Sequence, residues 1–512
     1  MRTRRAVTAL ISTGMAVSVV FASGGPAQAS PFAGARPGAA GIGDALFPEL
    51  GNGGYDVAHY GIDFAWQPDQ TFRERTVILA RATQSLSAFD LDFGGTAVQS
   101  VRVNGLPASF ARTGEELVVT PRFPLLRGLP FVVDVATSGS TSDVVFEAPF
   151  PGPFPFQQTK SGGFALTDQP RFGHFAFPSN DHPADKATYD FAITAPVGWT
   201  AVANGVLVGR STHGTDQTWH YAQRQPMASE LVSIAVDTYA VTSQTGPHGL
   251  LVRNYFPAGM EAKYGPIAAL GADEIAWMEQ QVGRYPFDQY GIQILDPTRR
   301  FGFALENQTL SIYDPGFFNR PQSTWEPVLV HELAHQWFGD SVAPERWSDV
   351  WLNEGHATWY EQTFAELKGY GTLIDRMREE YSFGDQDRAD FGPVAQPNSG
   401  ALGILFSVNV YDGGALVLFA LREKVGAARF AQIEREWVRL HRGESVGTQD
   451  FISLATRIGG PSVRPFLTDW LYGTTTPPMP NHPDWTVMPV STGASAVAVA
   501  RSATSPAVQL GS

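Results

Sequence analysis

The sequence predicts an α+β protein of more than one domain, in which an antiparallel β domain precedes a mostly helical domain. Short runs of β-type residues, broken by Gly, Pro and Asn, dominate the first half of the chain. Apolar residues at three-to-four spacing dominate the second half. A length of 512 residues also exceeds that of one ordinary domain.

The first 29 residues are predicted to be a secretion signal rather than part of the fold. Arg2, Arg4 and Arg5 precede an apolar stretch over residues 6–22, and a small-x-small cleavage pattern ends at Ala29. A membrane anchor is the alternative, but polar residues and glycines interrupt the stretch. No later segment is apolar enough to span a bilayer. We therefore expect a secreted, extracellular protein with no membrane span after cleavage.

The mature chain is divided by composition and periodicity. Residues 30–44, rich in Pro, Gly and Ala, are predicted to be a flexible leader. Residues 45–242 are predicted to be the β domain, and residues 243–475 the helical domain. Residues 476–512 are predicted to be a C-terminal tail, with disorder expected after Trp485. The clearest predicted strands cover residues 57–65, 98–103, 117–120, 131–135, 189–193 and 231–236.

Helices are predicted where the apolar period changes to that of a helix. They cover residues 266–282, 324–338, 354–367, 413–424, 428–441, 449–458 and 464–471. Ser323 and Glu326 have the spacing of a capping box at the start of the second of these helices.

Charge and the absence of cysteine restrict the function. The formal charge of −14 becomes −17 when the three arginines of the signal are removed, so nucleic acid is an unfavourable partner. The chain contains no cysteine, so neither a disulfide nor a thiolate metal site can form. Any zinc must bind to His, Asp or Glu.

One segment has the spacing of a zinc site. His331 and His335 lie four residues apart, on one face of a predicted helix, so that both imidazoles can reach one ion. Glu354 follows after an interval of eighteen residues, in a second predicted helix that could return its carboxylate to the metal. These three ligands would leave a fourth position for water, which distinguishes a catalytic zinc from a structural one. We expect one Zn²⁺ per chain.

Two further carboxylates are candidates for the same site. Glu332, next to His331, cannot share its ligand geometry and is predicted to be the general base that takes a proton from water. Glu361 lies seven residues after Glu354 on the same helix face and could accept the second ring N–H of a ligand histidine. A solvated helix carboxylate is the alternative for Glu361.

These residues resemble the M1 family of zinc aminopeptidases. The similarity is carried by His331-Glu-Leu-Ala-His-Gln-Trp-Phe-Gly339 and by Trp351-Leu-Asn-Glu-Gly355. It extends more loosely from residue 55 to residue 470 and includes a motif at residues 177–183, followed by Lys186. The resemblance implies a thermolysin-like catalytic domain in the second half of the chain. It also implies hydrolysis of the N-terminal peptide bond of peptides that have a free N-terminus.

The same resemblance assigns further site residues. Phe303-Ala-Leu-Glu-Asn307 is similar to the exopeptidase motif of the family, which implies that Glu306 binds the substrate α-amine. The backbone of Phe303 and Ala304 would then hold the peptide as an added strand. Tyr411, in a Tyr-x-x-Gly element, would donate its O–H to the oxyanion.

Several positions depart from the family pattern. Asp340 replaces the usual Asn, and His356 replaces an aromatic residue. His174 occupies a place where Arg is common. The register leaves open whether Asp168 or Gln169 lines the first substrate pocket. Because the long helical C-terminal domain of typical members is not seen, we expect two domains and a more open cleft.

Two alternatives remain. A zinc endopeptidase of the thermolysin type shares the helix motif and Glu332 but does not need Glu306. A catalytically inactive, zinc-stabilised binding protein would need neither Glu332 nor Tyr411. The sequence does not indicate the preferred first residue or the oligomeric state.

Overall fold

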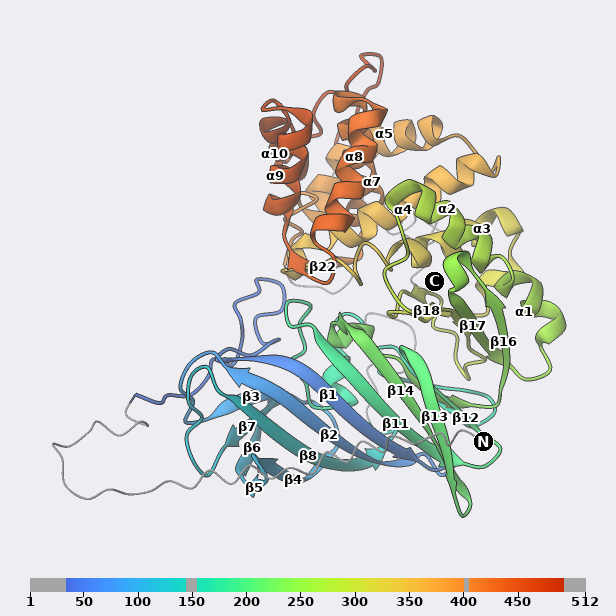
Figure 1. The fold of residues 1–512 in the computed structure, drawn as a ribbon. Helices are drawn as coiled ribbons and strands as arrows, with labels where there is room; N and C mark the ends of the chain where they lie inside the picture. The colour runs from blue at the N-terminus through green and yellow to red at the C-terminus, as the bar shows by residue number, and fades with distance from the viewer. Residues whose placement is uncertain (1–33, 144–153, 400–404, 492–512) are drawn as a thin grey trace, which may run out of the picture.

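The computed structural model describes residues 34–143, 154–399 and 405–491, which form a β domain and, stacked above it, a domain rich in helices (Figure 1). The predicted α+β fold with a β domain before a helical domain is confirmed. The predicted signal (1–29) lies outside the described residues, as do residues 30–33 of the predicted leader and 492–512 of the predicted tail.

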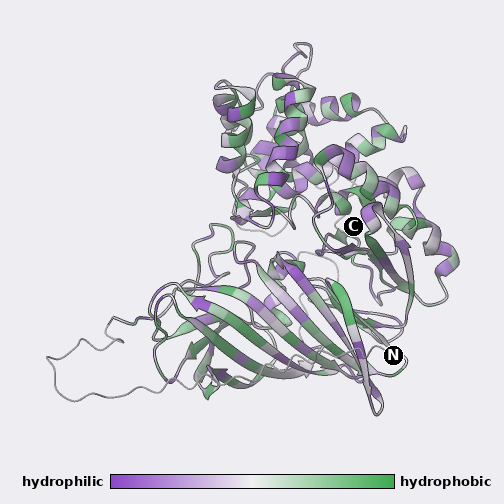
Figure 2. Cartoon of the chain, viewed as in Figure 1, coloured by the Kyte–Doolittle hydropathy of each residue, from purple (hydrophilic) through white to green (hydrophobic). Residues whose placement is uncertain are grey.

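A large eight-stranded sheet forms the β domain. Its neighbours pair antiparallel, except that β1 pairs parallel with β11. Buried and exposed residues alternate along its strands, as in β2, so one face of the sheet covers the core and the other meets solvent. Figure 2 shows hydrophobic and hydrophilic residues mixed along these strands. The strand order is β13 (Val206–His213), β14 (Asp216–Met227), β11 (Ala187–Pro196), β1 (Tyr55–Trp66), β2 (Thr71–Ala82), β8 (Pro130–Ser140), β4 (Ala97–Val103) and β5 (Leu106–Pro107).

Two smaller sheets complete this domain. One has the order β12 (Thr200–Ala203), β15 (Ile234–Asp237), β10 (Phe164–Leu166), β9 (Phe156–Gln158), and the other β3 (Phe89–Asp92), β7 (Glu116–Thr120), β6 (Ser109–Thr113). All predicted strands have a counterpart. The one predicted at 231–236 begins only at Ile234, because Ser229–Leu231 forms a 3-10 turn.

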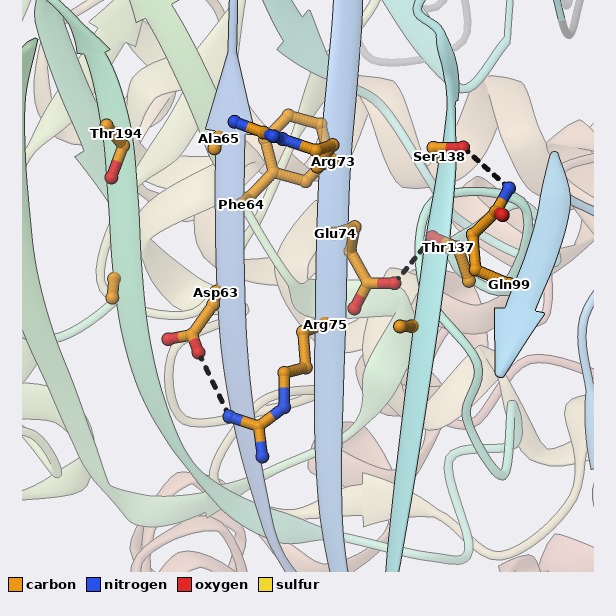
Figure 3. Close-up of a pocket in the computed structure, with 12 residues that line it drawn as sticks. Asp63, Phe64, Ala65, Arg73, Glu74, Arg75, Gln99, Thr137, Ser138 and Thr194 are labelled. Atoms are coloured by element: carbon orange, nitrogen blue, oxygen red, sulfur yellow. Dashed lines mark hydrogen bonds and ion pairs between the residues drawn. The ribbon is translucent and has the colours of Figure 1, made fainter. Parts of the chain in front are cut away.

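One buried carboxyl lies on the core face of the large sheet. Glu74 on β2 accepts hydrogen bonds from the hydroxyls of Thr76 and Thr137, the latter at 2.7 Å (Figure 3). Burial raises the pKa of Glu74 to about 8, despite both hydroxyls. The strands that carry Glu74 and Thr137 also line a hollow of about 610 Å³, where Arg73 and Arg75 stand beside them.

The second domain contains a mixed sheet that the sequence analysis did not predict. Its order is β16 (Tyr239–Thr245), β17 (Leu251–Pro257), β19 (Ile292–Ile294), β21 (Ser311–Tyr313) and β20 (Ala304–Leu305), with β18 (Gln289–Tyr290) paired to β17. Several of these strands have only two or three residues, too few to show an alternating pattern.

Helices form the rest of this domain. They are α1 (Glu261–Ala268), α2 (Gly271–Val282), α3 (Gln322–Ala334), α4 (Trp351–Leu367), α5 (Leu373–Phe391), α7 (Val408–Val425), α8 (Ala427–Leu440), α9 (Thr448–Gly459) and α10 (Val463–Tyr472). Short strands β22 (Ala343–Pro344) and β23 (Ser445–Val446) pair beside them. Among the described residues, no helix has the length and apolar character that crossing a membrane requires.

Two helix predictions were wrong in detail, and one helix was not predicted. Residues 266–282 form two helices, α1 and α2, rather than one. The helix α3 begins at Gln322 after Pro321 and has no side-chain cap, so the predicted capping box is absent there. The helix α5 was missed, since its buried residues form a narrow stripe in a strongly charged sequence.

Hydrogen bonds of Asp44 and Lys186 connect the two domains. Asp44, at the end of the predicted leader, accepts hydrogen bonds from the backbone N–H of Trp347 (2.8 Å) and from Nε2 of His182 (3.1 Å). Lys186 of the β domain donates to the carbonyls of Asp340 and Ser341 at 2.6 and 3.0 Å. The segments just before α4 and just after α3 are therefore anchored to the β domain.

Candidate active site and metal centre

Helices α3 and α4 bring three buried side chains to one point. The Nε2 atoms of His331 and His335 each lie 3.2 Å from Oε2 of Glu354. One possible ligand atom from each residue lies within 4.8 Å of the other two. Each of these residues is at most 2% exposed. The structure thus gathers the three residues that the sequence predicted as zinc ligands.

Each histidine ring is oriented by its other nitrogen. His335 donates from Nδ1 to the carbonyl of Phe338 at 3.1 Å, and His331 donates from Nδ1 to Oε2 of Glu361 at 3.0 Å. With Nδ1 as the donor, each Nε2 atom faces Glu354 and is the ring atom that would bind a metal. Glu361 lies where a partner for a ligand histidine must lie.

The donor set fits zinc. Two imidazole nitrogens and one carboxylate oxygen are the ligands of a catalytic zinc that keeps a further position open. Burial alone would raise the pKa of Glu354, but the two histidines outweigh it and lower the pKa to about 2. The carboxylate is therefore ionised at any physiological pH, which is the form that binds a metal.

Glu332 lies beside this centre without joining it. One possible ligand atom each of Glu306, Glu332 and His335 lies within 4.8 Å of the other two. Burial raises the pKa of Glu332 to about 8, with Glu306 and Glu354 adding to the effect. A carboxyl with a pKa near neutrality can both accept and return a proton.

Glu306 is held by contacts from both domains. Gln169 of the β domain donates from Nε2 to Oε1 of Glu306 at 2.6 Å. Gln336, which follows His335, donates to the backbone carbonyl of Glu306 at 2.9 Å and accepts from the N–H of Thr309 at 2.8 Å. Glu306 is only 3% exposed, so its carboxyl group lies in a largely dry environment.

The side chains of Asp168 and Gln169 have different environments in the structure. Gln169 contacts Glu306, whereas the carboxyl of Asp168 is buried and has no hydrogen-bond partner among the described residues. Burial raises the pKa of Asp168 well above its ordinary value, and the nearby Asp181 and Glu230 add to this shift. The sequence left open which of the two lines the first substrate pocket, because the register of this segment is shifted relative to the family pattern.

The residues before Glu306 form the edge of the mixed sheet. The strand β20 pairs with β21 on one side, as Ala304 with Tyr313 and Leu305 with Ile312, and is the last strand of the sheet. The carbonyl of Phe303 accepts from the N–H of Asp314 at 3.2 Å. An edge strand next to Glu306 can add an extended peptide as a further strand.

Tyr411 lies in the first turn of α7, against the metal centre. Its ring is parallel to that of His331, with centroids 5.7 Å apart and an angle of 8°. Burial raises the pKa of Tyr411 well above its ordinary value, and the carboxylates of Glu354, Glu306 and Glu332 raise it further. The hydroxyl therefore keeps its proton and can serve as a hydrogen-bond donor.

His356 lies behind the centre rather than in it. Its ring stacks on Phe338 with centroids 4.4 Å apart, and its Nδ1 donates to the carbonyl of Leu352 at 2.8 Å. Its Nε2 lies 3.4 Å from Oε1 of Glu434. It is a packed histidine in an aromatic environment.

Asp340 and His174 occupy buried polar sites. The carboxyl of Asp340 has no hydrogen-bond partner among the described residues, and burial raises its pKa well above the ordinary range. His174 lies 2.6 Å from Asp181 through Nδ1 and 3.4 Å from Glu115 through Nε2. Burial alone would lower the pKa of His174, but Asp181 and Glu115 outweigh it and raise the pKa to about 9. His174 is thus a buried imidazolium between two carboxylates.

Comparison with known proteins agrees with this geometry. Residues 270–470 match the peptidase family M1 domain. Aminopeptidase M1-B of Oryza sativa subsp. japonica is 24% identical over 307 residues, which cover 57% of this chain and 35% of that protein. Leukotriene A-4 hydrolase of Xenopus laevis is 24% identical over 409 residues, covering 73% of this chain and 64% of that protein. The chain thus spans about a third of the length of the plant aminopeptidases that it matches.

Solved structures cover nearly the whole fold. A mutant M1 zinc metallopeptidase of Deinococcus radiodurans, bound to a Tyr-Ser-Ala substrate, superimposes with a TM-score of 0.75 and 28% identity. The match covers 86% of this chain and 100% of that chain. A two-domain M1 zinc metallopeptidase mutant bound to L-tryptophan gives the same TM-score, identity and coverage. The chain therefore contains a peptidase family M1 domain over residues 270–470, and its sequence and two-domain fold are similar to those of M1 zinc metallopeptidases.

Proposed function

We propose that the protein is a zinc aminopeptidase that hydrolyses the first peptide bond of peptides with a free N-terminus. One observation supports this more than any other. Acceptor atoms of Glu306 lie within 4.8 Å of those of Glu332 and His335, so the predicted amine-binding carboxylate stands beside the predicted base. In a peptide, the α-amine and the first carbonyl carbon are two covalent bonds apart, about 2.5 Å. An amine bound at Glu306 therefore leaves only the first peptide bond within reach of the base.

Binding of the amine follows from charge and burial. A substrate ammonium can pair with Glu306, whose position Gln169 and Gln336 hold through the contacts described above. A blocked N-terminus would leave this buried carboxylate without a counter-charge, which is unfavourable. The edge of β20 would align the following residues as an added strand.

The chemical step is assigned to two side chains. Zinc, when bound by His331, His335 and Glu354, supplies a Lewis acid that polarises a carbonyl and lowers the pKa of water. Glu332 takes the proton of the attacking water and returns it to the leaving nitrogen. Tyr411 donates its O–H to the oxygen that becomes negative as the carbonyl is attacked.

The test compares a peptide with its N-acetylated twin, with and without a chelator. The proposal expects cleavage of the free-amine peptide from its N-terminus, sensitivity to the chelator, and almost no cleavage of the acetylated peptide. Internal cleavage of both peptides would instead identify an endopeptidase. Bound zinc without cleavage of any peptide in a panel would identify a binding protein.

We also propose that the protein is secreted, on the basis of the basic and apolar pattern of its first 29 residues. Expression of the full chain in its own host, followed by N-terminal sequencing of protein from the culture medium, tests this. Recovery only from within cells, with Met1 or Arg2 as the first residue, would contradict it.

A further inference from the structure

Two glycines meet where helices α4 and α7 cross. A Cβ atom added to Gly355 of α4 would lie 2.8 Å from the Cα of Gly414 of α7. A Cβ atom added to Gly414 would lie 2.7 Å from the Cα of Gly355. Both contacts are with backbone atoms, which cannot rotate away as a side chain would. The two backbones therefore touch directly, and no side chain fits between them.

This contact lies between two parts of the site. Gly355 directly follows Glu354, one of the predicted zinc ligands. Gly414 lies three residues after Tyr411, which is about one helical turn. On one side of the crossing is a metal ligand, and on the other is the hydroxyl donor. The parallel packing of Tyr411 on His331, at 5.7 Å, depends on how closely α7 approaches.

We propose that the Gly355–Gly414 contact is a positioning device, which sets the distance between the Tyr411 hydroxyl and the reacting carbonyl. The inference rests on the aminopeptidase function proposed above. Ordinary carbon contacts begin at 3.4 Å, so a methyl group at either glycine must move the helices apart by roughly 0.6 Å or more. Displacements near 1 Å are enough to cost about a hundredfold in rate when a catalytic group loses alignment.

The kinetic parameter that changes distinguishes a positioning role from simple destabilisation of the fold. Alanine favours a helix more than glycine does, so Gly414→Ala should not weaken α7 itself. Any loss of activity in this variant should come from the displaced crossing of α4 and α7. Because Tyr411 is assigned a contact that forms only as the carbonyl is attacked, the loss should fall on kcat and leave KM unchanged.

The experiment is a double-mutant cycle with a free-amine peptide. Wild type, Gly414→Ala, Tyr411→Phe and the double variant are compared for kcat, KM and zinc content. We expect Gly414→Ala to lower kcat about 10- to 100-fold, with zinc and KM retained. In the Tyr411→Phe background, Gly414→Ala should have almost no further effect. An unchanged kcat, or an equal loss in both backgrounds, would overturn the inference.

Two further variants complete the design. Gly271→Ala is the matched control, since a Cβ at this buried helical glycine of α2 meets its nearest atom at 3.8 Å, an ordinary contact. It should keep the wild-type kcat. If Gly414→Ala does not fold, Gly355→Ala places the methyl group on the opposite helix and enters the same cycle.

A crystal structure of the variant gives a readout that needs no activity. We expect the centroids of Tyr411 and His331 to lie farther apart in Gly414→Ala than the present 5.7 Å. An unchanged separation would contradict the inference even if the wild type cleaves no peptide. Absence of cleavage by the wild type would by itself contradict only the proposed function.

Discussion

The Nε2 atom of His335 lies 3.2 Å from Oε2 of Glu354, although eighteen residues separate them in the chain. The first residue closes α3 and the second lies in the first turn of α4. Both are buried, so an uncompensated charge on either would be costly. A bound cation would compensate the charge at this point, and the donor atoms are those that zinc prefers.

Removal of the base should separate binding from turnover. We expect Glu332→Gln to keep its zinc, because Glu332 is not in the His331, His335 and Glu354 group. Its kcat should fall by about 10²- to 10⁴-fold, the usual contribution of a general base. Metal analysis and peptide hydrolysis measure the two effects. Turnover equal to that of the wild type would rule out the assigned role.

Glu361 should act through the metal rather than through the substrate. In Glu361→Ala, Nδ1 of His331 loses its partner at 3.0 Å, and the ring is no longer fixed. Zinc affinity should fall about 10- to 100-fold, as measured by competition with a chelating dye. Glu366→Ala, an exposed glutamate on the same helix, is the control and should bind zinc as the wild type does. Equal affinity in both variants would argue for a purely structural Glu361.

Loss of the Glu306 carboxylate should lower activity more than loss of one hydrogen bond to it. Glu306→Ala removes the carboxylate, and kcat/KM for a free-amine peptide should fall about 100-fold or more. Gln169→Leu removes only the hydrogen bond at 2.6 Å, and we expect a loss of about tenfold. In Glu306→Ala the preference for the free-amine peptide over its acetylated twin should almost disappear. A preference that persists would place the amine elsewhere.

The stability of the β domain should depend on pH through Glu74. Its folded pKa of about 8 lies above the ordinary value of 4.5, so the folded state binds the proton more tightly than the unfolded state does. Wild-type stability should therefore fall as pH rises from about 4.5 to about 8. Glu74→Gln cannot ionise, and relative to wild type it should gain roughly 3–5 kcal/mol between pH 4.5 and pH 9. Denaturant unfolding at both pH values measures this, with the exposed Glu49→Gln as the control. A gain that is the same at both pH values would contradict the assignment.

His174 should contribute stability at low pH. Its folded pKa of about 9 lies above the ordinary 6.5, so its contribution is complete below pH 6.5 and is lost as pH rises through 9. At pH 6, His174→Gln should be less stable than wild type by roughly 2–3 kcal/mol, and the difference should shrink above pH 9. The exposed His213→Gln is the control. A deficit that does not change with pH would mean that His174 is neutral in the fold.

The comparison of sequence and structure shows where local patterns suffice. Five of the predicted strands lie within observed ones, because each has enough residues to show its alternation. The mixed sheet of the second domain could not be predicted, because strands such as β20, with two residues, owe their geometry to their neighbours. The helix α5 was missed for a related reason, since its buried Tyr381 packs on Trp470 and Trp485, which lie far along the chain.

By itself, the sequence predicted the zinc ligand set and its base, and the structure brings these residues close together. The spacing of His331 and His335 is fixed by the helical period, which is a local property of the backbone. Only the tertiary structure decided that Gln169 rather than Asp168 meets Glu306, and that Gly355 and Gly414 touch. These contacts join residues 137 and 59 positions apart. They arise when separately formed elements pack together, and no periodicity in the chain encodes a distance through space.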